Sequence, residues 1–282
     1  MKPPGDPDQQ EAYALARRVL LDALYALGDQ RDAVVLVGAQ AIYLHTGDTD
    51  LAVAPFTTDG DVAINPEKLR VDPKLEEALH DAGFKKDAQN VGTWIASRPL
   101  RGTHVNVAID LMVPEAVGGP GRRGARLGVH GKSAARKAKG LEAALVDYQT
   151  RSIEALDDTD SQVLEVAVAG PAALLVAKLH KIAERIDSPD RSRNKDALDV
   201  YRLLQSIPTE TLADGIRRLL DNRVAAGVTE EAVTFLRTLF SEPSRKGCQM
   251  VASAVASLES GETIAQSCAF LTEDLLKEID DS

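Results

Sequence analysis

Two aspartates separated by one residue, Asp59 and Asp61, are the side chains whose spacing points most directly to chemistry. They lie in DGDVAI (59–64), which alternates like a half-buried β-strand. Successive side chains of a strand point to opposite faces, so the two carboxylates project side by side from one face. Carboxylates this close raise each other's pKa unless a cation intervenes, and hard oxygen ligands favour Mg²⁺ or Mn²⁺. The pair therefore predicts a divalent metal site.

A third acid, Asp110, lies late in a second predicted strand, THVNVAIDLMV (103–113), on the face opposite its apolar residues. If the two strands are neighbours, Asp110 is a natural third metal ligand. The alternative is structural, because short acidic patterns are common. In that interpretation Asp59 and Asp61 are turn residues after the Thr57–Thr58 pair, and Asp110 merely ends a strand.

The segments around these acids predict the elements that must position them. DAVVLVG (32–38) is typical of a short buried strand that enters a glycine, and AQAIYLH (39–45) of a helix that follows it. Helical periodicity also marks 11–27 and 73–83, and 91–97 predicts a further strand. The first part of the chain is therefore expected to form a mixed sheet with flanking helices.

The character of the sequence changes at Pro171, a residue favourable at a helix start. From there to the C-terminus, successive segments have helical periodicity. We therefore expect an α+β fold in two parts: a mixed domain at 1–168 that carries the three acids and an all-helical domain at 169–282.

Charge is unevenly spread along the 282 residues, whose net charge is −10. This balance argues against a protein that coats nucleic acid generally, because phosphate binding is driven by cationic surface. Residues 122–139, the basic segment, nevertheless hold seven cations and no acid, which leaves −17 for the remainder (−10 minus 7). The cations are Arg122, Arg123, Arg126, Lys132, Arg136, Lys137 and Lys139. We expect a helix from Lys132 to Lys139, then strands near 141–149 and 162–168.

The remaining composition gives two further expectations. The start, MKPPGDPDQQ, lacks the apolar run of a signal peptide, and no stretch approaches the roughly 18 apolar residues of a membrane span, which predicts a cytoplasmic protein that does not bind membranes. Cys248 and Cys268 lack partners at metal-ligand spacing, and we interpret them as two reduced core thiols.

The order of strand, glycine turn, helix, Asp-x-Asp pair and later single Asp resembles the nucleotidyltransferase superfamily. The sequence is most similar to its AbiEii-type toxin branch, which includes the mycobacterial MenT-like toxins. The resemblance covers roughly residues 30–206 and rests on VVLVGAQAIYLH, TTDGDVAI, VNVAIDLM, LLVAKLHKIAER and NKDALDVYRLL. A Lys helix followed by an Arg and then Lys-Asp-x-x-Asp is the branch's downstream feature. Its places are taken by Lys178, Arg185, Lys195, Asp196 and Asp199.

The resemblance implies an Mg²⁺-dependent (or Mn²⁺-dependent) nucleotidyltransferase that uses an NTP as substrate. It would transfer NMP to an acceptor hydroxyl, with a tRNA 3′ end favoured, and so block translation; it also implies a cognate antitoxin protein as a partner. In this interpretation the metal ligands are Asp59, Asp61 and Asp110, and Lys178 and Asp196 join them as catalytic residues. Asp199 is kept as an additional candidate.

Nucleotide binding is expected from two places in the sequence. At 100° per residue, Lys178, Lys181 and Arg185 fall within one stripe of a helix, which suits a triphosphate. The turn at Gly38 and Ala39 would let the backbone approach phosphate oxygens. Two departures from the family pattern concern phosphate contacts: Ala39 replaces the usual second Gly or Ser, and Pro55 stands where many relatives carry an Arg.

Several alternatives stay open from the sequence. The cationic stripe is also typical of a solvated helix face, and Asp196 could simply complement a helix dipole. The basic segment is where we would place the tRNA backbone, yet its charge also fits a surface loop without a partner. The acceptor could instead be a protein side chain or a small molecule, and the chain could be an inactive relative that binds RNA or a partner.

Overall fold

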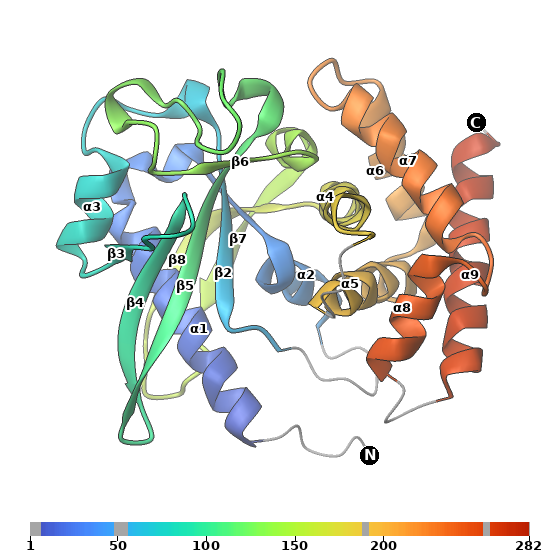
Figure 1. Cartoon of the computed structure of the whole chain (residues 1–282), viewed down its shortest axis with the longest axis horizontal. Coiled ribbons are helices and arrows are strands. Elements are labelled where there is room, and N and C mark those ends of the chain that lie inside the picture. The colour runs from blue at the N-terminus through green and yellow to red at the C-terminus, as the bar shows by residue number, and fades with distance from the viewer. Residues whose placement is uncertain (1–6, 48–55, 188–191, 256–259, 282) are drawn as a thin grey trace.

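The computed structural model describes residues 7–47, 56–187, 192–255 and 260–281. Figure 1 shows a twisted sheet on one side of the molecule and a group of helices on the other, with α2 (Gly38–Thr46) between them. No helix within the described ranges is long and apolar enough to cross a membrane. The predicted mixed sheet with flanking helices and a helical C-terminal region is confirmed.

Within the described residues, eight strands form one mixed sheet. Its order is β3 (Lys85–Lys86), β4 (Thr93–Leu100), β5 (Thr103–Pro114), β2 (Asp59–Ile64), β1 (Val34–Val37), β8 (Val163–Ala169) and β7 (Tyr148–Glu154). The short strand β6 (Arg136–Ala138) pairs with the last residues of β5, beyond the point where β4 ends. At the centre, β2 runs parallel to β5 and antiparallel to β1, and β1 runs parallel to β8.

The apolar faces of the strands decide which helix covers them. A Cβ added at Gly60 of β2 would lie 2.8 Å from Ile109 of β5 and 3.1 Å from Leu20, which belongs to α1 (Pro7–Ala26). Helix α1 therefore packs on the Gly60 face of the sheet. Because neighbouring residues of a strand alternate, the carboxylates of β2 lie on the opposite face. Helix α3 (Leu75–Asp81) contacts α1.

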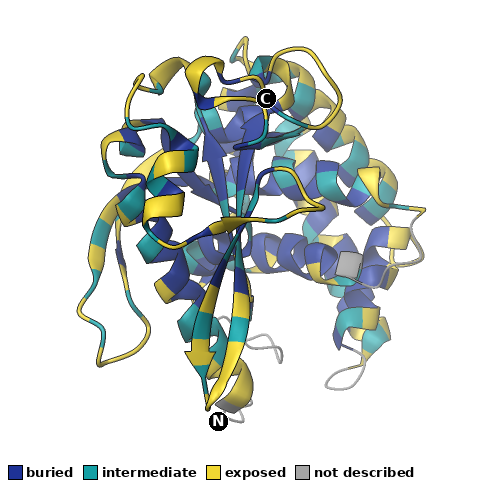
Figure 2. Ribbon diagram, turned by 60° about the vertical axis from the view of Figure 1, so that its left-hand side comes forward, coloured by how far each residue is buried: buried dark blue, intermediate teal, exposed yellow. Residues whose placement is uncertain are grey.

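Helices α4 to α9 make up the chain from Pro171 onward, as the periodicity predicted. They are α4 (Pro171–Glu184), α5 (Ser192–Ser206), α6 (Thr209–Leu220), α7 (Ala226–Phe240), α8 (Lys246–Val255) and α9 (Gly261–Asp280). Both α4 and α5 contact α2, so the helical region packs directly on the sheet domain. Figure 2 shows buried residues concentrated along the sheet and on the helices beside it. Cys248 and Cys268 are buried and free, in accord with their interpretation as core thiols.

Two local predictions in the middle of the chain are wrong. Residues 132–135 form bends and 136–138 form β6, so the helix expected from Lys132 to Lys139 does not exist. The strand expected near 141–149 is a 3-10 helix, Leu141–Leu145, before β7 begins at Tyr148. At 136–138 tertiary pairing overrides local propensity, because β6 finds its hydrogen-bond partner in β5. The strand expected at 162–168 is confirmed as β8.

Candidate functional site

The three predicted acids meet on adjacent strands. Asp61 of β2 is the direct Cα partner of Asp110 of β5, and Asp59 is the partner of Ala108, which belongs to the same face as Asp110. The parallel pairing of β2 with β5, which the sequence could only suppose, thus brings Asp59, Asp61 and Asp110 together.

The glycine turn lies against the same acids. Val37, the last residue of β1, is the Cα partner of Asp61, and Gly38 begins α2 with a φ of 71°. A Cβ at Gly38 would lie 2.6 Å from Asp61 Cβ, closer than real side chains approach. Only glycine combines this backbone conformation with this contact. The first backbone N–H groups of α2, including that of the buried Ala39, therefore start beside Asp61.

The surroundings of Asp61 disfavour the ionised form of its carboxyl group. Burial, together with the neighbouring charges of Asp59 and Asp110, raises the pKa of Asp61 to about 6. Lys181 and Lys178 act in the opposite direction. Two lysines of α4 are thus electrostatically close to the acids of the sheet, which places both predicted halves of the site in one electrostatic environment.

Asp110 and Asp59 already have protein partners. Asp110 Oδ1 accepts a hydrogen bond of 2.6 Å from the Thr93 hydroxyl, and Asp110 Oδ2 accepts one of 3.1 Å from Arg136 Nη2. The Thr57 hydroxyl donates a short hydrogen bond to Asp59 Oδ1. Sequence reasoning missed Thr93 and Arg136 as site residues. Thr93 is the Cα partner of Asp110, which no spacing in the sequence reveals.

A divalent cation suits the chemistry of this donor set, since three clustered carboxylates, among which Asp61 has a raised pKa, favour a positive charge among them. Within the described ranges, however, no three acidic, His or Cys side chains are already gathered as ligands around one point. Both carboxylate oxygens of Asp110 already accept a hydrogen bond, one from Thr93 and one from Arg136. Asp59, Asp61 and Asp110 would hold the ion, which would then lie close to the Arg136 guanidinium.

The second half of the site is a buried ion cluster between α4 and α5. Lys178 Nζ lies 2.8 Å from Asp196 Oδ1 and 2.7 Å from Asp199 Oδ2, and all three side chains are buried. Lys181 Nζ lies 3.0 Å from the same Asp196 oxygen, but its side chain is 38% exposed. Of the two lysines, Lys181 is the one that a ligand can reach.

The ion cluster keeps its charges despite burial. Burial alone would lower the pKa of Lys178, but Asp199 and Asp196 hold that pKa well above its usual range. Burial alone would raise the pKa of Asp196, but Lys178 and Lys181 hold that pKa below its usual range. The cluster therefore behaves as a structural ion pair network whose outer member, Lys181, faces outward.

The other predicted residues of this region lie at its margin. Helix α4 ends at Glu184, so the exposed Arg185 follows the helix and does not extend the stripe of Lys178 and Lys181. Lys195 Nζ lies 5.4 Å from the ring centroid of Phe56, just before β2. Pro55 lies outside the described residues.

A chain of buried polar side chains ends in a hydrogen bond to the backbone of Asp59. Arg17 of α1 donates from Nε to Gln40 Oε1 at 2.7 Å, and Gln40 Nε2 donates to the backbone carbonyl of Asp59 at 2.9 Å. Both side chains are almost fully buried. Arg17 Nη2 also donates to the Tyr13 hydroxyl at 3.2 Å. Sequence reasoning missed this chain too, since Gln40 carried no signal beyond its place after the glycine turn.

The basic segment divides into engaged and exposed cations. Lys139 pairs with Glu231 of α7, Lys137 Nζ donates to the Gly119 carbonyl, and Arg136 pairs with Asp110. The other cations are exposed and form no ion pair with acids in the described part of the chain. These are Arg122, Arg123, Arg126 and Lys132.

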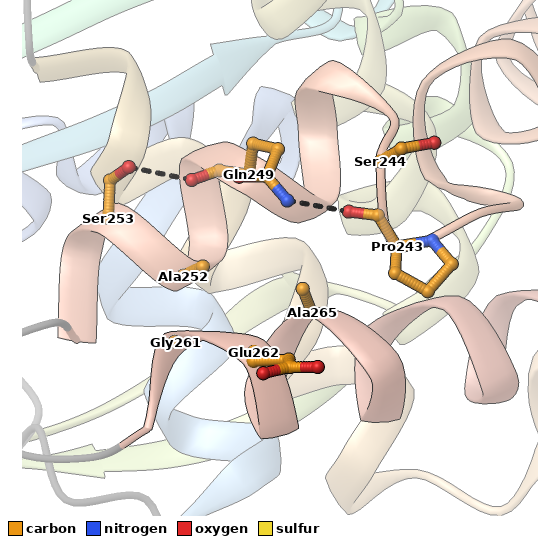
Figure 3. A pocket seen from close by; sticks show the side chains of 8 residues that line it. All are labelled: Pro243, Ser244, Gln249, Ala252, Ser253, Gly261, Glu262 and Ala265. Carbon is orange, nitrogen blue, oxygen red and sulfur yellow. Dashed lines mark hydrogen bonds between the residues drawn. The ribbon is translucent and has the colours of Figure 1, made fainter.

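A separate open cavity of about 550 Å³ lies between α8 and α9 (Figure 3). Gln249, Ser253 and Glu262 are among the side chains that line it, and Gln249 Nε2 donates to the Pro243 carbonyl at 2.8 Å. None of the predicted site residues lines this cavity.

Comparison with known proteins adds no assignment. No protein-family model matches the sequence, and no curated protein matches it significantly. The function is therefore inferred from the residues and their geometry.

Proposed function

We propose that the chain is a divalent-metal-dependent nucleotidyltransferase that transfers a nucleoside monophosphate from an NTP to an acceptor hydroxyl. The observation that supports this most is the register of β2 and β5, which sets Asp61 beside Asp110 with Asp59 on the same face. A carboxylate triad next to a glycine turn and a cationic helix is the donor set that in-line phosphoryl chemistry needs.

Each part of the site has a role in the proposed reaction. A divalent ion held by the three carboxylates would offset the charge of the triphosphate and lower the pKa of the attacking hydroxyl. Asp110 orients that hydroxyl and helps to accept its proton. Gly38 lets the start of α2 approach phosphate oxygens, where backbone N–H groups favour an anion.

We assign the triphosphate contact on α4 to Lys181 in preference to Lys178. The Lys178 side chain is only 7% exposed and its ammonium bridges two carboxylates, whereas the Lys181 side chain is 38% exposed and its charge acts to lower the pKa of Asp61. Lys178 and Asp196 then act by fixing Lys181 beside the leaving pyrophosphate. Arg185, exposed after the end of α4, can reach the same anion only as a peripheral charge.

The acceptor that we propose is an RNA 3′ end, with tRNA as the first candidate. The exposed cations of the basic segment support this, because they lie in the same segment as Arg136, which touches Asp110. A phosphate backbone bound to these cations would approach the carboxylates from the side of β6.

The proposal is tested by incubating the protein with Mg²⁺, each labelled NTP and separate acceptor pools of total tRNA, protein and small molecules. We expect label in the tRNA pool with wild type and none with Asp59→Asn. Label confined to protein or small molecules would replace the acceptor and keep the reaction. Equal labelling by wild type and Asp59→Asn, or no labelling of any pool, would refute the proposed activity.

A further inference from the structure

The ion pair between Arg136 and Asp110 lies where a metal would have to bind. Arg136 Nη2 is 3.1 Å from Asp110 Oδ2, and Thr93 occupies the other carboxylate oxygen at 2.6 Å. The Asp110 side chain is 24% exposed and that of Arg136 is 31% exposed, so the pair is half-buried at the rim of the site. Both oxygens of Asp110 thus accept hydrogen bonds from protein groups. Asp110 is also the acid next to Asp61, where the proposed metal ion would bind.

Arg136 lies on a paired strand and not in a loop. Strand β6 pairs with the end of β5, with Arg136 as the Cα partner of Met112. Arg136 also forms an isolated bridge with Gly124. Gly92 packs tightly against the backbone of β5, because a Cβ there would lie 2.6 Å from the Leu111 carbonyl oxygen. Strand pairing therefore fixes the backbone of Arg136 at the end of β5, and from there its guanidinium contacts Asp110.

We propose that Arg136 and a divalent metal ion compete for Asp110. Arg136 neutralises the carboxylate in the metal-free protein, and its positive charge lowers the affinity of the site for the ion. The inference rests on the proposed metal-dependent function and adds a residue that sets the metal affinity.

The physical reason is electrostatic: the guanidinium already neutralises the Asp110 carboxylate, and a divalent cation bound to the same carboxylate would be repelled by the guanidinium at short distance. Binding of the ion therefore weakens the ion pair, and the ion pair weakens binding of the ion, because the two equilibria are linked. Removal of the guanidinium should strengthen metal binding, whereas simple damage to the site would weaken it.

The test is a titration of the full-length protein with Mn²⁺ in the absence of nucleotide and acceptor. Electron paramagnetic resonance measures the free ion at each step. We expect Arg136→Gln to bind Mn²⁺ about tenfold more tightly than wild type, the range that loss of one half-buried ion pair can produce. Arg136→Lys keeps the charge but loses the planar fork, so its affinity should fall between the two.

The matched control is Arg126→Gln, which removes one positive charge from the same segment. Arg126 is exposed and forms no ion pair with acids of the described residues, so its loss should change Mn²⁺ affinity by less than about twofold. Equal tightening by Arg126→Gln would mean a general field effect and would overturn the competition, as would unchanged or weaker binding by both Arg136 variants.

The Mn²⁺ titration also separates this inference from the proposed activity. Asp59→Asn should abolish binding if the carboxylates form the metal site. Tighter Mn²⁺ binding by Arg136→Gln, together with no transfer by wild type to any acceptor, would support the competition and refute the proposed activity. Failure of wild type and both Arg136 variants to bind Mn²⁺ would overturn the competition.

Discussion

Gly38 lies in direct contact with Asp61, at a distance that leaves no room for a side chain. The contact joins the turn between β1 and α2 to the carboxylates of β2. It explains why the turn needs glycine at this position but accepts alanine at the next, because Ala39 lies inside α2 and only Gly38 has a positive φ. The turn and the acids are therefore one structural unit.

Substitution Gly38→Ala should disable this unit. The φ of 71° alone costs an L-residue about 1 kcal/mol, and the new methyl must displace Asp61. We expect a loss of about 1–3 kcal/mol in the free energy of unfolding and loss of nucleotide transfer. Urea denaturation and the labelling assay measure the two effects. Gly28→Ala is the matched control, because a Cβ there meets nothing within 4 Å.

Asp61 should make the metal-free protein less stable as the pH rises. Its pKa is raised from 3.8 to about 6 in the folded protein, so between these values the folded state binds more protons than the unfolded state. The free energy of unfolding therefore falls with increasing pH across this window, and the penalty is complete above it. It is absent below the unfolded pKa.

Replacement by Asp61→Asn removes this penalty while it abolishes transfer. We expect the metal-free variant to exceed wild type in stability by about 1–3 kcal/mol at pH 8, and by less at pH 5. Urea denaturation in the presence of a chelator measures both. Asp158→Asn, an exposed acid, should show no such trend. A stability gain of Asp61→Asn that is equal at both pH values would contradict the assignment.

Replacement of the two lysines of α4, Lys178 and Lys181, should have different effects on stability and on nucleotide binding. Lys178→Met leaves the buried Asp199 without the Lys178 ammonium and leaves Asp196 with Lys181, which should cost about 3–5 kcal/mol in the free energy of unfolding. Lys181→Met removes a partly exposed ion pair and should cost less than about 1 kcal/mol. Its effect should instead be a raised KM for NTP. Urea denaturation and steady-state kinetics measure the two effects, and normal stability of Lys178→Met would contradict the buried network.

The elements that local periodicity defines could be predicted from the sequence. The helices after Pro171, the strand at Asp59 and the strand at Asp110 all carry their pattern within a few residues. The common face of the acids followed from the alternation of a strand, and only the adjacency of the two strands had to be supposed. It is fixed by the pairing of β2 with β5.

What the sequence could not predict depends on distant partners. Arg136 belongs to a segment with helical propensity, and only its pairing with β5 makes it a strand residue beside Asp110. Likewise Lys178 and Lys181 look equivalent on a helical wheel. Packing of α5 on α4 buries the first with Asp196 and Asp199 and leaves the second partly exposed.

The exposed cations of the basic segment give the last prediction. Replacement of Arg122, Arg123 and Arg126 together by Gln should weaken tRNA binding and leave stability unchanged, because these exposed side chains form no ion pair with acids in the described part of the chain. For each phosphate that the variant no longer neutralises, the slope of log affinity against log salt should also fall by about 0.7–0.9. Filter binding at several salt concentrations measures both quantities.

The control for the triple variant removes the same charge elsewhere. Arg223, Lys246 and Lys277 are exposed cations of the helical region, and their joint replacement by Gln gives the same net charge. If tRNA docks on the basic segment, this control keeps the salt slope of wild type while its affinity falls only slightly through the general field. Equal loss of affinity and of slope in both variants would show that the basic segment is not the docking surface.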